Sequence, residues 1–139
     1  AGFTAADHLD DLEAALLWAH RAIKLSNLSG DTYPWIGDCW ILVGRAGVAN
    51  GMAEATEGAF KTGLKLQAQL AGEVPAANFN LALGWKHYAD YLDNTSRQGE
   101  ALIALGEATK IVSTIPAALR GYPEIVAIVA AYHSRKDPG

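Results

Sequence analysis

The sequence predicts an all-α protein made of about six helices. Apolar residues recur at steps of three and four along almost the whole chain, which is the spacing of one helix face. No stretch alternates cleanly between apolar and polar residues, as a half-buried β-strand would. Short breaks rich in glycine, proline and asparagine interrupt the helical spacing, and short connections favour antiparallel neighbours. We therefore expect antiparallel helix hairpins.

The first two helices have recognisable ends. The first begins near Thr4, which is spaced from Asp7 as in a capping box. It ends before Gly30, because glycine suits the left-handed conformation that stops a helix. The second helix begins near Pro34, since proline is favoured at the first helical position. It runs to the pair Asn50-Gly51, and the third helix follows.

Proline residues and a second capping box delimit the remaining helices. Pro75 precedes the fourth helix, and the stretch NTSRQ breaks it, with Thr95 and Gln98 spaced as a capping box for the fifth. Pro116 and Pro123 mark a short turn before the last helix. The expected helices span roughly residues 4–26, 34–50, 52–70, 76–93, 95–113 and 124–134.

A row of small residues recurs along the chain. Ala15, Ala19 and Ala22 stand at steps of four and three, so they share one face of the first helix. Small side chains on that face allow the backbone of another helix to approach closely. The same arrangement recurs in segments 54–66 and 99–111, with a period of roughly 40–45 residues that is typical of stacked helical repeats.

One run of the sequence, WILVGRAGVANGMAEATEGAFKTGL, resembles a tetratricopeptide repeat. The pattern of that family places a tryptophan, a leucine and a glycine in the first helix, then a turn glycine, then small and aromatic residues in the second helix. Two positions depart from it, because Gly47 stands where an aromatic residue is expected and Thr56 replaces an alanine. The residues that fit are Trp40, Val43, Gly44, Gly51, Phe60 and Gly63.

A second copy of the pattern is weaker. Asn80 stands in place of the tryptophan, and the copy carries about five extra residues around YLDNTSRQ. Both units are longer than the usual repeat of about 34 residues. They resemble the longer repeats of kinesin light chains and of bacterial regulators with helical sensor domains. The residues kept in the second copy are Leu83, Gly84, Ala101, Leu105 and Ala108.

The resemblance implies a short right-handed solenoid that forms a single domain over residues 1–139. An alternative from the residues alone is a six-helix bundle in which the small residues only pack helices together. The parts of the implied solenoid are a half repeat over 4–30, repeats over 32–72 and 75–114, and a C-terminal helix over 116–135.

Composition restricts the classes of partner. The chain of 139 residues has a net charge of -4, and its basic residues are scattered, which argues against nucleic-acid binding. The apolar run IVAIVAAY near its end is too short to span a membrane. A single cysteine, and the lack of a signal-peptide pattern at the printed start, favour a cytoplasmic location.

The sequence contains no motif that predicts catalysis or metal binding. Its four histidines form no metal-binding pair, and neither a nucleophile elbow nor a P-loop occurs. Cys39 lies in an apolar helix and is expected to be a buried, unreactive thiol, because a nucleophilic cysteine needs a base or a positive charge nearby. We therefore expect no enzyme activity, no cofactor and no metal.

The resemblance implies a concave groove, lined by the first helix of each hairpin, that binds a peptide or a partner helix. Tryptophan, tyrosine and arginine side chains commonly anchor such interfaces. The expected partner-binding residues are Asp38, Arg45, Asn78, Leu81, Trp85 and Tyr88. The apolar C-terminal helix is expected to dock on another chain, either as the contact of a homo-oligomer or in place of a further repeat.

Two other interpretations stay open. In one, a small helical bundle, which could be an enzyme, encloses a small molecule in a pocket lined by aromatic residues near Trp35, Trp40, Trp85 and Tyr88. In the other, the chain is a structural oligomerisation domain. The sequence also allows Trp85 and Tyr88 to be core residues beneath a neighbouring helix.

Overall fold

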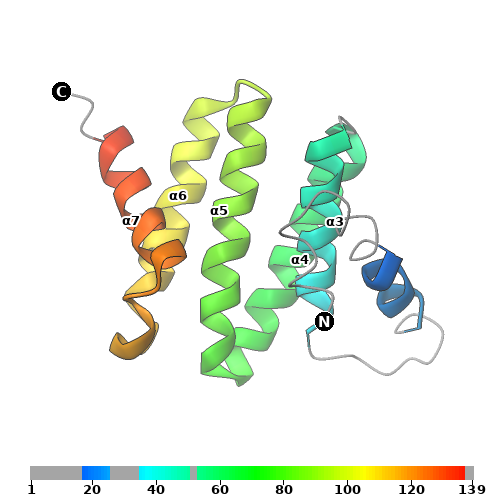
Figure 1. Cartoon of the computed structure of the whole chain (residues 1–139), viewed down its shortest axis with the longest axis horizontal. Coiled ribbons are helices and arrows are strands. Elements are labelled where there is room, and N and C mark those ends of the chain that lie inside the picture. Colours follow the sequence, from blue (N-terminus) through cyan, green and yellow to red (C-terminus); the bar gives the residue numbers. More distant parts are fainter. Residues whose placement is uncertain (1–16, 26–34, 51–52, 137–139) are drawn as a thin grey trace. The chain divides into compact units, whose positions relative to one another are not determined.

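The computed structural model describes residues 17–25, 35–50 and 53–136, and in these ranges the protein is all-α with six α-helices and no strand (Figure 1). This confirms the predicted fold class. The helices are a segment at 17–25, α3 (Ile36–Asn50), α4 (Ala53–Glu73), α5 (Asn78–Asn94), α6 (Gln98–Val112) and α7 (Pro123–Lys136). Short 3-10 helices lie at Pro75–Ala77 and Ala117–Leu119.

Most predicted helix ends agree with the structure to within a few residues. The predictions made on Thr4, Asp7, Gly30, Pro34 and Gly51 lie outside the described residues.

The chain divides into two compact units, Ala1–Gln67 and Ala68–Gly139, and the boundary falls inside α4. The first unit contains the 17–25 helix, α3 and most of α4, and the second contains α5, α6 and α7. The expected solenoid of hairpins in a single domain stays a prediction.

Glycine residues bring α3 and α4 of the first unit into close contact. A Cβ atom added to Gly37 would lie 2.9 Å from the backbone oxygen of Gly63, and one added to Gly63 would lie 2.9 Å from the backbone oxygen of Gly37. Nearer the other end of the pair, a Cβ on Gly44 would lie 3.0 Å from the ring of Phe60. The missing side chains therefore let two backbones meet, which offsets the low helix propensity of glycine.

The 17–25 helix packs its small face on α3. Ala19 and Ile23 are buried, and they form one core cluster with Ile36, Cys39 and Leu42 of α3. Ala15 lies outside the described residues, and a close approach of another backbone to the row stays a prediction.

Three helices form the core of the second unit, where α5, α6 and α7 lie side by side (Figure 1). The buried residues of one cluster in this core are small on α5 and on the middle of α6, and branched at the end of α6, just after it and on α7. They are Ala82, Ala108, Val112, Ile115, Ile125 and Ile128. The side chains of Ile125 and Ile128 are fully buried, so the inner face of α7 belongs to the core of its own unit.

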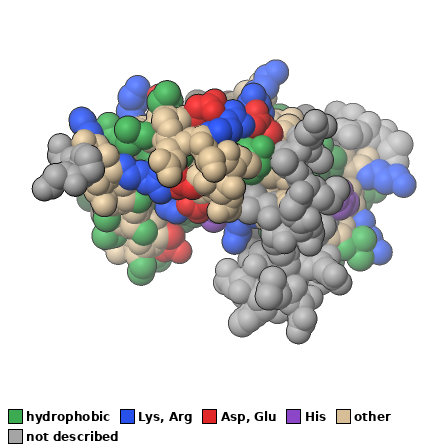
Figure 2. All heavy atoms as spheres, turned by 90° about the horizontal axis from the view of Figure 1, so that it is seen from above, with side chains coloured by type: hydrophobic (Ala, Val, Ile, Leu, Met, Phe, Trp, Pro, Cys, Tyr) green, Lys and Arg blue, Asp and Glu red, His purple; other side chains and the backbone are tan. Residues whose placement is uncertain are grey.

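Polar contacts fix the ends of these three helices. Arg120 follows α6 and donates to the backbone oxygens of Ile115 at 2.8 Å and of Ser113 at 2.9 Å. Arg135 of α7 forms a paired contact with the carboxylate of Asp93 on α5, with Nη1 2.6 Å from Oδ1. Figure 2 looks onto the end of the unit where α5 ends and α6 begins, and it shows acidic and basic side chains beside one another.

The turn between α5 and α6 differs from the expected capping box. The hydroxyl of Thr95 donates back to the backbone oxygens of Tyr91 and Leu92, and Arg97 occupies the N-cap of α6 without a side-chain cap. Ser96 has a φ of 61°, and the amides of Ser96 and Arg97 donate to the backbone oxygens of Asp93 and Leu92. This pair of hydrogen bonds is a Schellman motif. The break therefore caps the C-terminus of α5, whereas the N-terminus of α6 has no side-chain cap.

Replacing Ser96 by glycine is expected to stabilise the second unit by about 1 kcal/mol, because glycine adopts a positive φ without the steric cost that serine pays. Chemical denaturation followed by circular dichroism measures the change. The control is Gln98→Gly, which places the same residue in the first turn of α6 and is expected to destabilise the unit. Equal effects of the two substitutions would contradict the interpretation.

Candidate functional site

Two of the predicted partner-binding residues, Asp38 and Arg45, lie on α3 of the first unit. They are seven residues apart, which is two helical turns, so they share one side of the helix. Both are half-buried. The side-chain amide of Gln67 on α4 donates to Oδ1 of Asp38 at 2.7 Å. Gln67 is 5% exposed and was not expected at the site; its only signal in the sequence is a polar residue on the apolar side of α4.

The other four predicted partner-binding residues lie on α5 of the second unit, and two of them are buried more deeply than the other two. Leu81 is 6% exposed and Tyr88 is 9% exposed, so both offer little surface to a partner. Asn78 and Trp85 are half-buried. The side-chain amide of Asn78 donates to the backbone oxygen of Pro75 at 3.1 Å and ties the start of α5 to the preceding turn.

Three aromatic side chains of α5 form a row. The ring centroids of Trp85 and Tyr88 are 6.1 Å apart, and Tyr88 stacks on Tyr91 at 6.0 Å. Trp85 also packs against the core of the second unit. Tyr91 is buried. The spacing of three residues between successive rings is the sequence signal for this row, because such residues stack along one helix face.

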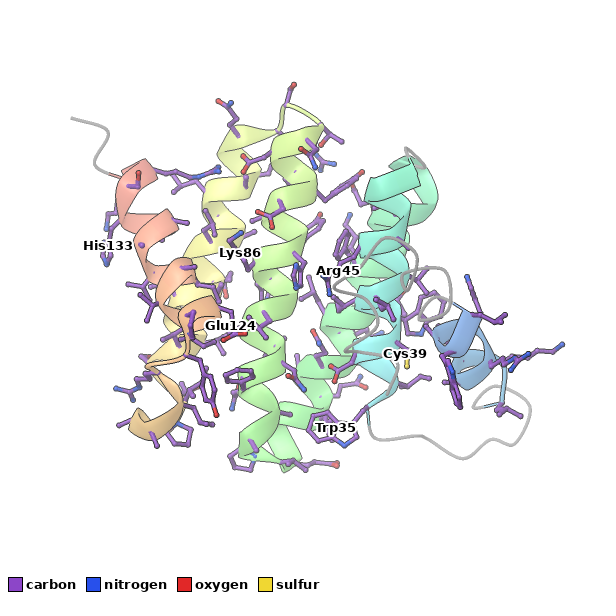
Figure 3. All side chains as sticks on the ribbon, in the orientation of Figure 1. Trp35, Cys39, Arg45, Lys86, Glu124 and His133 are labelled. Atoms are coloured by element: carbon purple, nitrogen blue, oxygen red, sulfur yellow. The ribbon has the colours of Figure 1, made fainter. Side chains whose placement is uncertain are left out.

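Cys39 has the surroundings of a structural thiol. Its sulfur lies between α3 and the 17–25 helix (Figure 3), within the buried cluster of the first unit. Burial raises the pKa of the Cys39 thiol above its ordinary value, and the negative charge of Asp38 raises the pKa further. Both effects lower the thiolate fraction at neutral pH, which is the opposite of what a nucleophile requires.

The outer surface of α7 is less apolar than its sequence indicated. Val126 is the one large hydrophobic residue exposed on this helix, at 54%, and His133 points away from the unit (Figure 3). Association of copies through the C-terminal helix stays a prediction.

Within the described ranges, no group of three or more histidine, cysteine, aspartate or glutamate side chains is placed to hold a metal ion. None of the helices described there combines the length and the apolar character needed to cross a bilayer. Comparison of the chain with protein-family models, with curated proteins and with solved structures gave no match.

Proposed function

We propose that the chain is a protein-interaction module of the tetratricopeptide type that captures a peptide or a partner helix without covalent chemistry. The contact between Gly44 and Phe60 supports the proposal, because these residues match the first-helix glycine and the second-helix aromatic residue of the repeat pattern. Recognition by stacked helix pairs needs an extended surface rather than a closed pocket. The proposed role includes neither catalysis nor nucleic-acid binding.

The observation that carries the proposal is the setting of Trp85. Its ring lies 6.1 Å from that of Tyr88 and packs against the core of the second unit, while the residue as a whole is only half-buried. A tryptophan that is already fixed loses little conformational freedom when a partner covers it. Such partly exposed, pre-ordered aromatic residues are the usual centres of binding energy at interfaces.

Arg45 adds a charge that a partner could recognise. Arg45 is half-buried on α3, so part of its surface is exposed. Guanidinium groups bind carboxylates with two parallel hydrogen bonds. We therefore propose that a partner of the first unit presents an acidic residue to Arg45. We also propose a cytoplasmic location, since a single unpaired cysteine is suited to a reducing compartment.

The test begins with peptides selected on the purified chain from a displayed random library, whose affinities are then measured by calorimetry. Trp85→Ala and Arg45→Glu are each expected to weaken binding about tenfold or more, since each removes an anchor. Ile103→Ala and Lys65→Glu are matched controls, because they change an exposed apolar residue and an exposed lysine elsewhere.

Circular dichroism establishes that each variant is folded. Because Trp85 also contacts the core, Arg45→Glu provides the independent result if Trp85→Ala proves unstable. Binding unchanged within about twofold in folded variants of both residues would show that the assignment of the surface is wrong.

A further inference from the structure

The outer side of the 17–25 helix is both apolar and basic. Trp18 and Leu25 are each 66% exposed and Leu17 is 53% exposed, although all three are large hydrophobic residues. Arg21 and Lys24 are exposed beside them. We call these five residues the basic helix face. Steps of three and four residues place its members on one side of the helix.

The opposite side of the same helix is fixed in the first unit. Ala19 is 2% exposed and Ile23 is 8% exposed, and both belong to the cluster that contains Cys39. The helix is therefore anchored by one side, and the basic helix face is presented on the other. Exposed tryptophan and leucine side chains that are grouped in this way indicate a binding surface.

The charges indicate the kind of partner. Residues 17–25 include histidine, arginine and lysine but no aspartate or glutamate. The segment DHLDDLE, which precedes them in the sequence, is instead rich in acidic residues. Asp7, Asp10, Asp11 and Glu13 supply four carboxylates there, and Leu9 and Leu12 supply apolar side chains. The chain thus encodes an acidic, leucine-containing segment that is complementary to its own basic helix face.

We propose that the basic helix face binds the acidic segment 7–13 of a second copy of the chain, forming a two-fold symmetric dimer. Within one copy, residues 14–16 alone connect the two, and their sequence is Ala-Ala-Leu. These are strong helix formers without glycine or proline, so a sharp reversal of the chain there is disfavoured. Binding in trans avoids that reversal.

The order of charges determines the orientation. Acidic residues precede basic residues along the sequence, so an antiparallel arrangement places opposite charges together at both ends, whereas a parallel one places like charges together. Each copy then donates one acidic segment and one basic helix face. An interface of this kind uses the same surface on both subunits and closes at the dimer.

The contact is small and depends on charge, so the dimer is expected to be reversible and to weaken as salt screens the pairs. Sedimentation of the full chain at several concentrations and salt levels measures this. Arg21→Glu with Lys24→Glu reverses the charge of the basic helix face, and Asp10→Lys with Asp11→Lys replaces two of the four carboxylates of the acidic segment by lysines. Each double variant alone is expected to weaken self-association about tenfold or more.

Mixing the two double variants is the decisive experiment. In the mixed pair, the unchanged acidic segment of one variant faces the unchanged basic helix face of the other, and the introduced lysines face the introduced glutamates, so a mixed dimer is expected to form about as tightly as the wild-type dimer. Lys61→Glu with Lys65→Glu is the matched control, because both lysines are exposed on α4 outside the basic helix face. This control is expected to remain dimeric.

Any one of four results would overturn the proposal. The wild-type chain could stay monomeric up to about 1 mM, a concentration at which even weak contacts form. The double variants could dimerise normally, which would place the contact elsewhere, or they could be monomeric without recovery on mixing. Binding of vesicles containing anionic lipid that needs Arg21 and Lys24, without any dimer, would assign the face to a lipid surface instead. Arg45→Glu should leave the dimer intact, which separates this proposal from the peptide-binding one.

Discussion

Replacing Phe60 by alanine is expected to lower the free energy of unfolding of the first unit by about 3–5 kcal/mol, the usual cost of removing a buried phenylalanine side chain. Phe60 is fully buried, and its ring lies against the backbone of Gly44. No side chain on Gly44 can fill the resulting cavity. Because the two units need not unfold together, hydrogen exchange of amides in α3 and α4 is the suitable measurement.

Two further variants identify the cause of the loss. Lys61→Ala changes the neighbouring exposed residue of α4 and should alter stability by less than about 0.5 kcal/mol. In the Phe60→Ala background, Gly44→Ala should recover part of the loss, since its methyl group enters the space that the ring vacated. A loss below about 1 kcal/mol for Phe60→Ala would mean that the ring is not a core residue.

Gly63→Ala and Gly58→Ala are expected to change stability in opposite directions although both lie in α4. A Cβ on Gly63 would meet the backbone oxygen of Gly37 at 2.9 Å and the tip of Ile41 at 2.8 Å, whereas a Cβ on Gly58 would meet nothing within 4 Å. Forcing the helices apart should cost about 1–3 kcal/mol or more. At Gly58 the better helix propensity of alanine should add up to about 1 kcal/mol.

The comparison of these two variants tests the close contact directly, because the chemical change is identical and only the surroundings differ. Hydrogen exchange in α3 and α4 again gives the free energies. Stabilisation by both substitutions would indicate that α3 and α4 are farther apart than described. Gly37→Ala, which meets the backbone oxygen of Gly63 at 2.9 Å, should behave like Gly63→Ala.

The helices of this chain could be predicted well because their signals are local. Apolar spacing and the proline and glycine breaks depend only on neighbouring residues, and helices such as α5 and α7 begin and end close to where these signals placed them. The break after α5 was predicted less well. Thr95 and Gln98 have the spacing of a capping box, but the positive φ of Ser96 directs the chain into a Schellman motif instead. Sequence spacing does not reveal which residue takes that conformation.

The candidate site could be predicted only in part. Apolar residues are buried on several sides of α5, so periodicity could not separate surface aromatic residues from core ones. In the structure Tyr88 is buried, while Trp85, three residues before it, is only half-buried. The exposed basic helix face was also missed, because Leu17, Trp18 and Leu25 look like core residues in the sequence. Exposure depends on which neighbours cover a helix, and those contacts join distant parts of the chain.

Because Cys39 is buried, the reactivity of its thiol reports the transient opening of the first unit. Cys39 is the single cysteine of the chain, and it is packed between two helices of the first unit. A thiol reagent can reach it only when those helices separate, so the labelling rate of the native protein counts opening events in that unit. Measuring the same labelling rate with added peptide, or at rising protein concentration, would show whether peptide binding or self-association stabilises the closed state of the first unit.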